Sequence, residues 1–396
     1  MSHFSYIVSA SRTPIGSFLG ELGDFTAPQL GGIAIKSCLE KNGGDFSVDE
    51  VLMGNVLQGG IGQAPARQAA LNAGLNIQTP CVTINKVCGS GLKTVMIADQ
   101  VIRAGDATRL VAGGMESMSN APHLTHALRK GSKLGDVQLL DGLVFDGLTC
   151  AFESCHMGNH AEHIARKYGV TREAQDQFAQ QSQLRAAKAI EQSLFDEEIV
   201  PIKVADRKRG ERLISRDECV RENTSLEGLS KLKPVFDCQG TVTAGNASTL
   251  SDGAAAVLVV DDKTAHQMDS AIKAKILGCF TSGTEPKDLF IAPVIAIRKL
   301  LEKTNTALEA IDYFEINEAF AAQMVACINE LGVNPEKVNV NGGGISLGHP
   351  IGASGTRCLV TLLHLLQKNQ AKLGLVSLCL GGGNAVAMLV ENTRAS

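Results

Sequence analysis

The chain carries the same pattern of helix, strand and glycine turn twice, and this repeat restricts the possible folds more than any other feature. Residues 34–41 (AIKSCLEK) have the pattern of an amphipathic helix and precede a strand-like run that ends in a polar turn at residues 53–55. Residues 296–303 (AIRKLLEK) precede a similar run that ends in a polar turn at residues 316–318. Two more pairs follow in the same order, which makes a chance likeness implausible. They are the glycine turns at 89–91 and 352–355, each ahead of a helix, and the apolar runs into glycines at 110–114 and 378–383.

Helices that alternate with short apolar strands predict an α/β fold, in which a mostly parallel sheet is covered by helices and is here built twice. We expect residues 1–118 and 248–270 to form the first half and residues 271–396 the second. Residues 119–247 differ, with a glycine- and leucine-rich stretch, a helical stretch over about 158–192 and a charged segment. They are predicted to form an inserted loop domain, and insertions of this kind often carry binding functions.

The composition excludes several classes of protein. A chain of 396 residues with 44% hydrophobic content can bury a large core, and a formal charge of −4 gives no bias toward nucleic acid. No run of about eighteen apolar residues occurs, so the sequence predicts neither a membrane-spanning helix nor a membrane partner. The N-terminus is expected to enter a strand without a signal segment, and the eleven cysteines include no CxxC pair. Thiols of this kind predict a reducing compartment, and hence a cytoplasmic protein.

Cys88 is the first candidate for chemistry, because it lies between a strand-like run and the start of a helix. The unpaired amides at a helix start favour negative charge, and the ionised thiol is the nucleophilic form of cysteine. The residues that follow it, Gly-Ser-Gly, leave room for a ligand beside the backbone. The alternative for this position is an inert cysteine of the core.

Three polar clusters follow strand-like runs in the second half, at residues 317–320, 341–355 and 379–383. Ligand sites of α/β sheets gather at the carboxyl ends of strands. We therefore expect the three clusters to lie on the same edge as Cys88.

These clusters supply His349 and Cys379. A zinc site is one interpretation of two cysteines and a histidine, but such sites usually have paired short spacings, which are missing here. We favour a thiol nucleophile, an imidazole that deprotonates it, and a second thiol for proton transfer. The glycines after Cys379 would offer backbone amides to a developing oxyanion.

Other candidate sites have weaker support. His156, His160 and His163 would share one face of a helix, but the HExxH pattern is absent and we predict no metal. No dinucleotide or P-loop phosphate motif occurs. The basic run at residues 207–209 is either a solvated surface or a contact for a phosphate group.

Four motifs together resemble those of the thiolases. They are NKVCGSG at 85–91, NEAF at 317–320, GGGISLGHPIG at 342–352 and CLGGG at 379–383. The likeness runs through nearly the whole chain in the right order and includes residues 240–248 and 252–256. It implies a five-layer α-β-α-β-α fold from two related halves, with a loop domain that holds coenzyme A.

The resemblance also implies a role for each site residue. Cys88 is similar to the nucleophile that carries the acyl group as a thioester, and His349 to the base that activates it. Asn317 resembles the residue that holds a water in the oxyanion site that His349 lines. Cys379 resembles the acid/base that handles the α-proton of the second acyl-CoA. The amides of Cys88 and Gly381 would form the second oxyanion hole.

Within the family, the chain resembles the biosynthetic, short-chain subgroup, which condenses two acetyl-CoA to acetoacetyl-CoA and CoA. Contacts with the acyl-CoA are expected from Leu148, His156, Met157, Arg221, Ser248 and Phe320. Gly228 departs from the pattern, because some relatives have an adenine-contacting serine there. The resemblance implies no prosthetic group, allows a monovalent cation, and suggests a homotetramer joined through residues 120–145. The alternatives are a degradative 3-ketoacyl-CoA thiolase and a non-catalytic CoA- or lipid-binding member of the fold.

Overall fold

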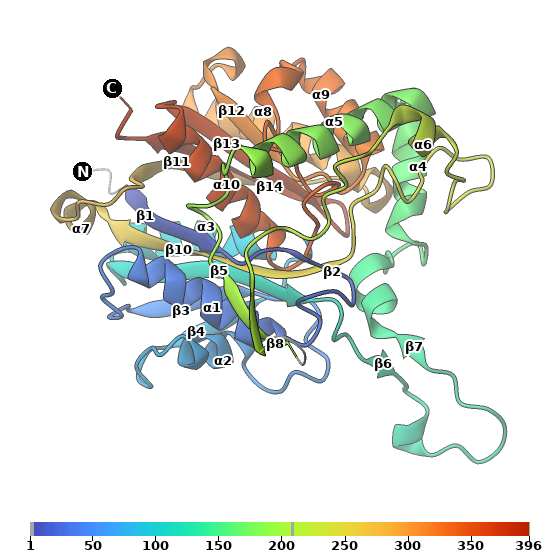
Figure 1. Cartoon of the computed structure of the whole chain (residues 1–396), viewed down its shortest axis with the longest axis horizontal. Helices are drawn as coiled ribbons and strands as arrows, with labels where there is room; N and C mark the ends of the chain where they lie inside the picture. The colour runs from blue at the N-terminus through green and yellow to red at the C-terminus, as the bar shows by residue number, and fades with distance from the viewer. Residues whose placement is uncertain (1–3, 207–209, 396) are drawn as a thin grey trace.

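The computed structural model describes residues 4–206 and 210–395, and the basic run at 207–209 lies outside them. One large mixed sheet runs through the molecule, with helices on its faces and a long excursion that projects from one end (Figure 1). No helix among the described residues is long and apolar enough to cross a membrane.

The first half alternates strands and helices as predicted. Its elements are β1 (Ser5–Arg12), β2 (Gly16–Ser17), α1 (Ala27–Glu40), β3 (Glu50–Gly54), α2 (Pro65–Asn72), β4 (Cys81–Ile84), α3 (Ser90–Ala104), β5 (Arg109–Ser117), β10 (Ser251–Asp261) and α7 (Asp262–Gln267). The second half repeats the order with β11 (Ala274–Gly283), η3 (Pro286–Ile291), α8 (Ala292–Thr304), η4 (Leu308–Ala310), β12 (Tyr313–Ile316), α9 (Ala321–Leu331), η5 (Pro335–Lys337), α10 (Ser354–Lys368), β13 (Leu373–Leu380) and β14 (Asn384–Asn392).

The strand order β12-β13-β14-β11-β1-β10-β5-β3-β4 shows the repeat directly. The two halves meet where β11 contacts β1, and the order can be followed outward from this contact in both directions. The strands β11, β14, β13 and β12 of the second half then correspond in turn to β1, β10, β5 and β3 of the first. The prediction of a mostly parallel sheet is wrong. Among the described strands of this sheet, β3–β4, β3–β5 and β12–β13 pair in parallel and the remaining pairs are antiparallel, including those of β10 and β14 with both of their neighbours along the strand order.

Alternate residues of the central strands face two different cores, and this alternation builds the layers. In β10, Ala255, Val257 and Val259 face the core shared with α3 and α10, while Ala254, Ala256 and Leu258 face the core under α1 and α2. On the outer face of the second half, the core contains residues of α8 and α9. Helices α3 and α10 contact each other between the two halves, which confirms the predicted five layers.

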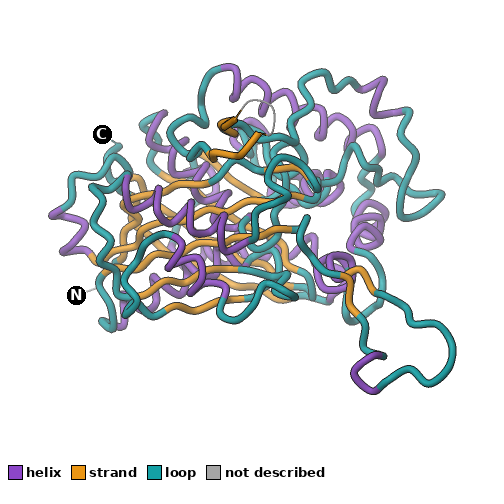
Figure 2. The backbone as a smooth tube through the Cα atoms, turned by 60° about the horizontal axis from the view of Figure 1, so that its bottom comes forward, coloured by secondary structure: helices purple, strands orange, loops and turns teal. Residues whose placement is uncertain are grey.

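Residues 119–247 add no described strand to the large sheet. They hold β6 (His123–Leu124), η1 (Leu128–Lys130), β7 (Leu140–Asp141), η2 (Leu143–Leu148), α4 (Met157–Lys167), α5 (Arg172–Glu191), β8 (Ile202–Asp206), β9 (Gly210–Ile214) and α6 (Leu226–Ser230). The helix expected over 158–192 is two helices, because Gly169 takes a left-handed φ of 64° and Thr171 caps α5. The segment from β6 to β7 forms the projecting excursion (Figure 2).

The inserted segment shares the cores of both halves. Ala161 and Ile164 of α4 pack into the outer core of the second half. Ile202 and Ile214 of the β8–β9 hairpin pack into the outer core of the first. The insertion therefore contacts both halves, and its predicted status as a separate domain stays a prediction.

Candidate active site

A cavity of about 810 Å³ opens where β4 and β13 end and the inserted segment covers them. All but one of the predicted site residues line it, although they come from three parts of the chain. They are Cys88, Leu148, His156, Met157, Arg221, Ser248, Phe320, His349, Cys379 and Gly381. Asn317 is the exception, because it is fully buried behind His349.

Cys88 lies in a tight turn between β4 and α3, as the sequence predicts. The Ser90 hydroxyl holds this turn, since it accepts from the Lys86 amide at 2.8 Å and donates to the Val87 carbonyl at 2.6 Å. Val87 has a left-handed φ of 48°, which is costly for a β-branched residue. A side chain at position 89 would come within 2.3 Å of Leu380, so only glycine lets the turn approach β13. The turn thus brings a thiol of the first half against a strand of the second.

The thiol of Cys88 is neutral in the free protein. Burial raises its pKa to about 12, although the backbone amides of Gly381 and of Cys88 itself lower it. The expectation that the helix start would favour the thiolate is therefore wrong for the free protein, because loss of solvation outweighs the amides. A base is needed to ionise this thiol. The same two amides lie where the resemblance predicts an oxyanion hole.

His349 is suited to act as that base. Burial, with a smaller contribution from Arg357, lowers the pKa of the imidazole to about 4, so the ring is neutral at pH 7. The Ser354 hydroxyl donates to the Pro350 carbonyl at 2.8 Å and lies 2.5 Å from Nδ1 of His349. Nδ1 must then carry the proton and donate it to Ser354, which leaves Nε2 as the unprotonated nitrogen.

Asn317 lies behind this imidazole. It directly follows β12, and its Nδ2 is 3.4 Å from Nε2 of His349. Its Oδ1 is buried without a hydrogen-bond partner, which is unusual for a buried amide. The contact supports a role beside His349, while the water that the resemblance assigns to Asn317 stays a prediction.

Cys379 is buried near the end of β13. Burial raises its pKa well above the ordinary value, and the neighbouring thiols of Cys88 and Cys327 add to the shift. The effect of Cys88 on Cys379 and their shared cavity show that the two predicted thiols lie close together. Once deprotonated, a thiol of such high pKa is a strong base.

The wall of the cavity opposite the thiols is aromatic. His156 caps α4, where its Nδ1 accepts from the Gly158 amide at 3.0 Å, and its ring stacks on Phe236 with centroids 4.6 Å apart. Phe236 meets Phe320 edge to face at 6.3 Å, and Phe320 meets Phe290 in the same way at 5.2 Å. Sequence reasoning missed Phe236 and Phe290, since neither belongs to a motif.

Arg221 of the inserted segment and Ser248, which directly follows that segment, line the same cavity. The Arg221 amide donates to Oε1 of Gln183 at 2.7 Å, and the Ser248 amide donates to the Ala319 carbonyl at 3.0 Å. Gly228 lies in α6, where its amide donates to the Ser225 hydroxyl, which caps that helix. A serine hydroxyl is therefore present near position 228, although not at it.

Two supporting residues were also missed. Ser354 fixes which ring nitrogen of His349 carries the proton. Its position five residues after His349, at the start of α10, was the feature of the sequence that could have indicated this contact. Glu116 belongs to none of the four sequence motifs. Its carboxylate accepts hydrogen bonds from the backbone amides of Val56, Leu57 and Gly352 at 3.1, 3.2 and 2.9 Å. It therefore ties the loop after β3 to the turn that carries His349.

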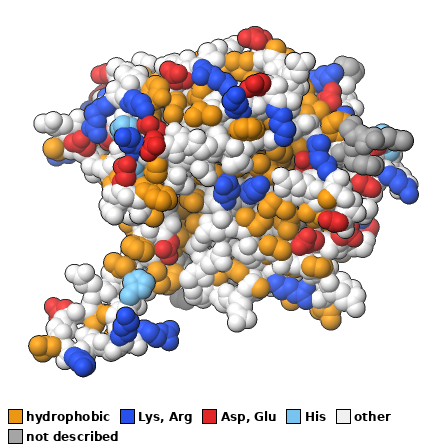
Figure 3. Space-filling model, turned by 180° about the vertical axis from the view of Figure 1, so that it is seen from behind, with side chains coloured by type: hydrophobic (Ala, Val, Ile, Leu, Met, Phe, Trp, Pro, Cys, Tyr) orange, Lys and Arg blue, Asp and Glu red, His pale blue; other side chains and the backbone are white. Residues whose placement is uncertain are grey.

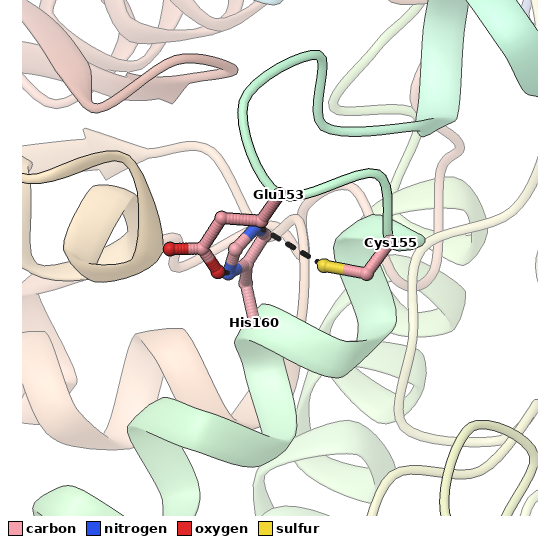
Figure 4. A group of neighbouring side chains, drawn as sticks. All are labelled: Glu153, Cys155 and His160. Carbon is pink, nitrogen blue, oxygen red and sulfur yellow. Dashed lines mark hydrogen bonds and ion pairs between the residues drawn. The ribbon is translucent and has the colours of Figure 1, made fainter.

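The three histidines on the predicted helix face do not converge. His156 stacks on Phe236, and His163 lies 2.9 Å from Asp288 of η3. His160 points instead toward Cys155 and Glu153 (Figure 4). No metal site of three histidines forms among these described residues.

A half-buried thiol with two amides beside it, a neutral imidazole and a second, fully buried thiol are the groups that an enzyme of acyl transfer needs. The family model for the N-terminal domain of thiolase matches residues 5–263, and the model for the C-terminal domain matches residues 270–392. The chain therefore belongs to the thiolase family, and the resemblance seen in the sequence is confirmed.

Similar proteins cover the chain from end to end. The acetyl-CoA acetyltransferase of Chromobacterium violaceum is 51% identical over 386 residues, which cover 97% of this chain and 98% of that protein. The acetyl-CoA acetyltransferase of Escherichia coli is 51% identical over 388 residues, with the same two coverages. The crystal structure of human mitochondrial 3-ketoacyl-CoA thiolase superposes with a TM-score of 0.95 at 40% identity and covers 99% of both chains.

Proposed function

We propose that the chain is an acetyl-CoA acetyltransferase, which condenses two acetyl-CoA to acetoacetyl-CoA and CoA and catalyses the reverse thiolysis. The observation that carries the proposal is the shared cavity of Cys88, His349 and Cys379 in a thiolase fold. Relatives about half identical over nearly the whole chain have this name. The substrates are CoA thioesters, and no prosthetic group takes part.

In the first step, Nε2 of His349 takes the proton of the Cys88 thiol, and the thiolate attacks the carbonyl carbon of acetyl-CoA. The amides of Cys88 and Gly381 stabilise the negative oxygen of the tetrahedral intermediate. The C–S bond to CoA then breaks, and the CoA thiolate takes the proton from Nε2 of His349 as it leaves. The product is an acetyl thioester on Cys88.

In the second step, Nε2 of His349 takes the proton of the Cys379 thiol, and the resulting thiolate removes the α-proton of a second acetyl-CoA. His349 and Asn317 stabilise the enolate oxygen, and the α-carbon attacks the acetyl carbonyl on Cys88. The bond between that carbonyl and Cys88 breaks, and the Cys88 thiolate takes the proton from Nε2 of His349, which releases acetoacetyl-CoA and restores the thiol. The high pKa of Cys379 supports this role, because the α-proton of a thioester is only weakly acidic.

Residues of the inserted segment, with Ser248 of the first half and Phe320 of the second, complete the proposed acyl-CoA site. Leu148, His156, Met157 and Phe320 would contact the acyl and pantetheine portions. Ser248 would contact the pantetheine, and Arg221 the adenine. The aromatic wall supports this arrangement, since a thioester chain needs an apolar passage with few polar groups.

The kinetic test compares chain lengths. We expect the purified protein to turn over acetoacetyl-CoA faster than 3-ketooctanoyl-CoA or 3-ketohexadecanoyl-CoA. Faster turnover of the longer substrates would contradict the proposal and favour a degradative 3-ketoacyl-CoA thiolase. No turnover of any of them, with CoA still bound, would favour a non-catalytic member of the fold.

We propose that the chain assembles as a homotetramer through the projecting excursion. Leu128, Leu134 and Leu139 there have 61%, 98% and 62% of their surface exposed. Basic side chains also gather on this excursion (Figure 3). Exposed leucines of this kind favour burial against another copy. Light scattering of a Leu134→Ser variant tests this, since a smaller particle with unchanged turnover is expected.

Two further proposals concern the surroundings of the enzyme. All eleven cysteines lie among the described residues as free thiols, which supports a reducing compartment such as the cytoplasm. Fractionation of the source cells tests this location. A monovalent cation beside the inserted segment is tested by the KM for acetoacetyl-CoA in potassium and in tetramethylammonium buffers, which should differ.

A further inference from the structure

A cluster of three potential metal ligands lies outside the proposed catalytic machinery, at the rim of the cavity. The Sγ of Cys155, a ring nitrogen of His160 and a carboxylate oxygen of Glu153 all lie within 4.8 Å of one another (Figure 4). Cys155 and Glu153 belong to the turn before α4, while His160 lies on the first turns of that helix. None of the three lines the cavity or takes part in the proposed reaction.

The distance between the two inner groups fits a hydrogen bond and also fits two ligands of one metal ion. Sγ of Cys155 is 3.5 Å from Nε2 of His160. Zinc binds sulfur at about 2.3 Å and nitrogen at about 2.1 Å, so two ligands at the tetrahedral angle lie roughly 3.6 Å apart. The observed separation therefore fits two neighbouring ligands of one ion without movement of either side chain.

The carboxylate of Glu153 is the third potential ligand. Oε2 of Glu153 lies 3.9 Å from the other ring nitrogen, Nδ1 of His160. His160 is fixed, with 2% of its side chain exposed, whereas the Glu153 side chain is 44% exposed and free to rotate. Because one ligand atom of each residue lies within 4.8 Å of the other two, movement of this exposed carboxylate would complete a set of one sulfur, one nitrogen and one oxygen ligand, with the fourth position left to water.

The backbone already holds the two protein segments together. The Cys150 amide donates to the Cys155 carbonyl at 2.8 Å, and Thr149 pairs with His156 as an antiparallel bridge. The turn between them includes Ala151 and Phe152, which line the cavity. An ion bound by Cys155, His160 and Glu153 would therefore fix this rim against α4.

We propose that Glu153, Cys155 and His160 form a binding site for a divalent metal ion of intermediate softness, with zinc as the preferred ion. Mixed sulfur, imidazole and carboxylate ligands select zinc and cobalt over magnesium or calcium, which take oxygen ligands. The site revises the prediction of no metal, because Cys155 and Glu153 complement a histidine that sequence reasoning weighed only with other histidines.

The test is a titration of the full-length protein with cobalt(II), in which thiolate ligation produces a sulfur-to-cobalt charge-transfer band in the near ultraviolet. We expect one equivalent to bind with this band and zinc to displace it. Cys155→Ser should abolish the band, and His160→Asn should weaken binding by about tenfold or more. Glu153→Gln should weaken it less, since this ligand is the exposed one.

Matched controls separate this site from other thiols. Cys238→Ser and His123→Asn change exposed side chains elsewhere and should bind cobalt as the unmodified protein does. A Cys88→Ser, Cys379→Ser double variant should also keep the band. Loss of the band in that double variant, its survival in Cys155→Ser, or its absence from the unmodified protein would overturn the proposal. None of these readouts requires turnover, so they are independent of the proposed activity.

Discussion

The two halves of the molecule place the same residue types at equivalent positions and use them differently. Asn55 follows β3 and Asn317 follows the equivalent strand β12, and both are fully buried. Asn55 donates to Glu116 at 2.7 Å, and this pair holds the backbone of neighbouring loops. Asn317 lies against His349 in the proposed site. The first asparagine supports the scaffold, and the second faces the chemistry.

The central helices show the same division. Ser90 and Ser354 are the first residues of α3 and α10, and both are buried. Ser90 binds only the backbone of the turn that carries Cys88, whereas Ser354 binds the ring of His349. The comparison indicates that the duplicated fold supplies two similar strand-to-helix junctions. One carries Cys88, the proposed nucleophile, and the other carries His349, the proposed base.

The largest effect should come from the nucleophile of the first half. Cys88→Ser replaces the thiol with a hydroxyl, which is far harder to ionise, so we expect thiolysis of acetoacetyl-CoA to fall by about 10³-fold or more. Mass spectrometry after incubation with acetyl-CoA should show no acetyl group on this residue. Cys238→Ser, which changes an exposed thiol, should keep full activity. Full activity in Cys88→Ser would refute the assignment.

A substitution in the second half should separate the two chemical steps. Cys379→Ser removes the proposed base for the α-proton, so condensation should fall by roughly 10²- to 10⁴-fold. Acetylation of Cys88 should persist, because His349 and the two amides remain. If Cys88 is no longer acetylated in this variant, the division of roles between the halves is wrong.

Titration of His349 should make the stability of the protein depend on pH. Its pKa is about 4 in the folded protein and 6.5 in an unfolded chain, so the unfolded state binds more protons between these values. Stability should therefore fall as the pH drops from 6.5 to 4, by about 3 kcal/mol from this group. Urea denaturation across that range measures the effect, which should shrink in His349→Asn and not in His123→Asn. Activity assigned to neutral His349 should also persist below pH 6.5.

Much of the fold was predictable from the sequence, because local patterns carry it. The repeated helix and strand periods gave the two halves, and a glycine-rich turn after a strand indicated the position of Cys88. The sequence did not indicate that β10 and β14 run antiparallel to their neighbours in the sheet. The direction of a strand depends on its pairing partners, which can lie far away in the sequence. The same limit applies to Glu116, whose contacts join residues 59 to 236 positions apart.

The electrostatics of the site were the least predictable part. The helix start at Cys88 suggested a lowered pKa, but burial raises it, and burial depends on packing between halves. The neutral state of His349 has the same origin. The residue types of the proposed site are therefore visible in the sequence, whereas their protonation states require the assembled structure.

The smallest effect should come from the paired serines, and it tests the comparison most finely. Ser354→Ala removes the acceptor of the Nδ1 proton, so the ring can exchange tautomers and Nε2 is less often free. We expect kcat to fall roughly tenfold, the equivalent of one hydrogen bond, with a shifted pH profile and partial rescue by Ser354→Thr. Ser90→Ala should instead lower the free energy of unfolding by about 1–3 kcal/mol and leave the pH profile unchanged, because Ser90 binds only backbone. Equal effects of the two substitutions on the pH profile would mean that Ser354 only stabilises the fold and does not control the protonation of His349.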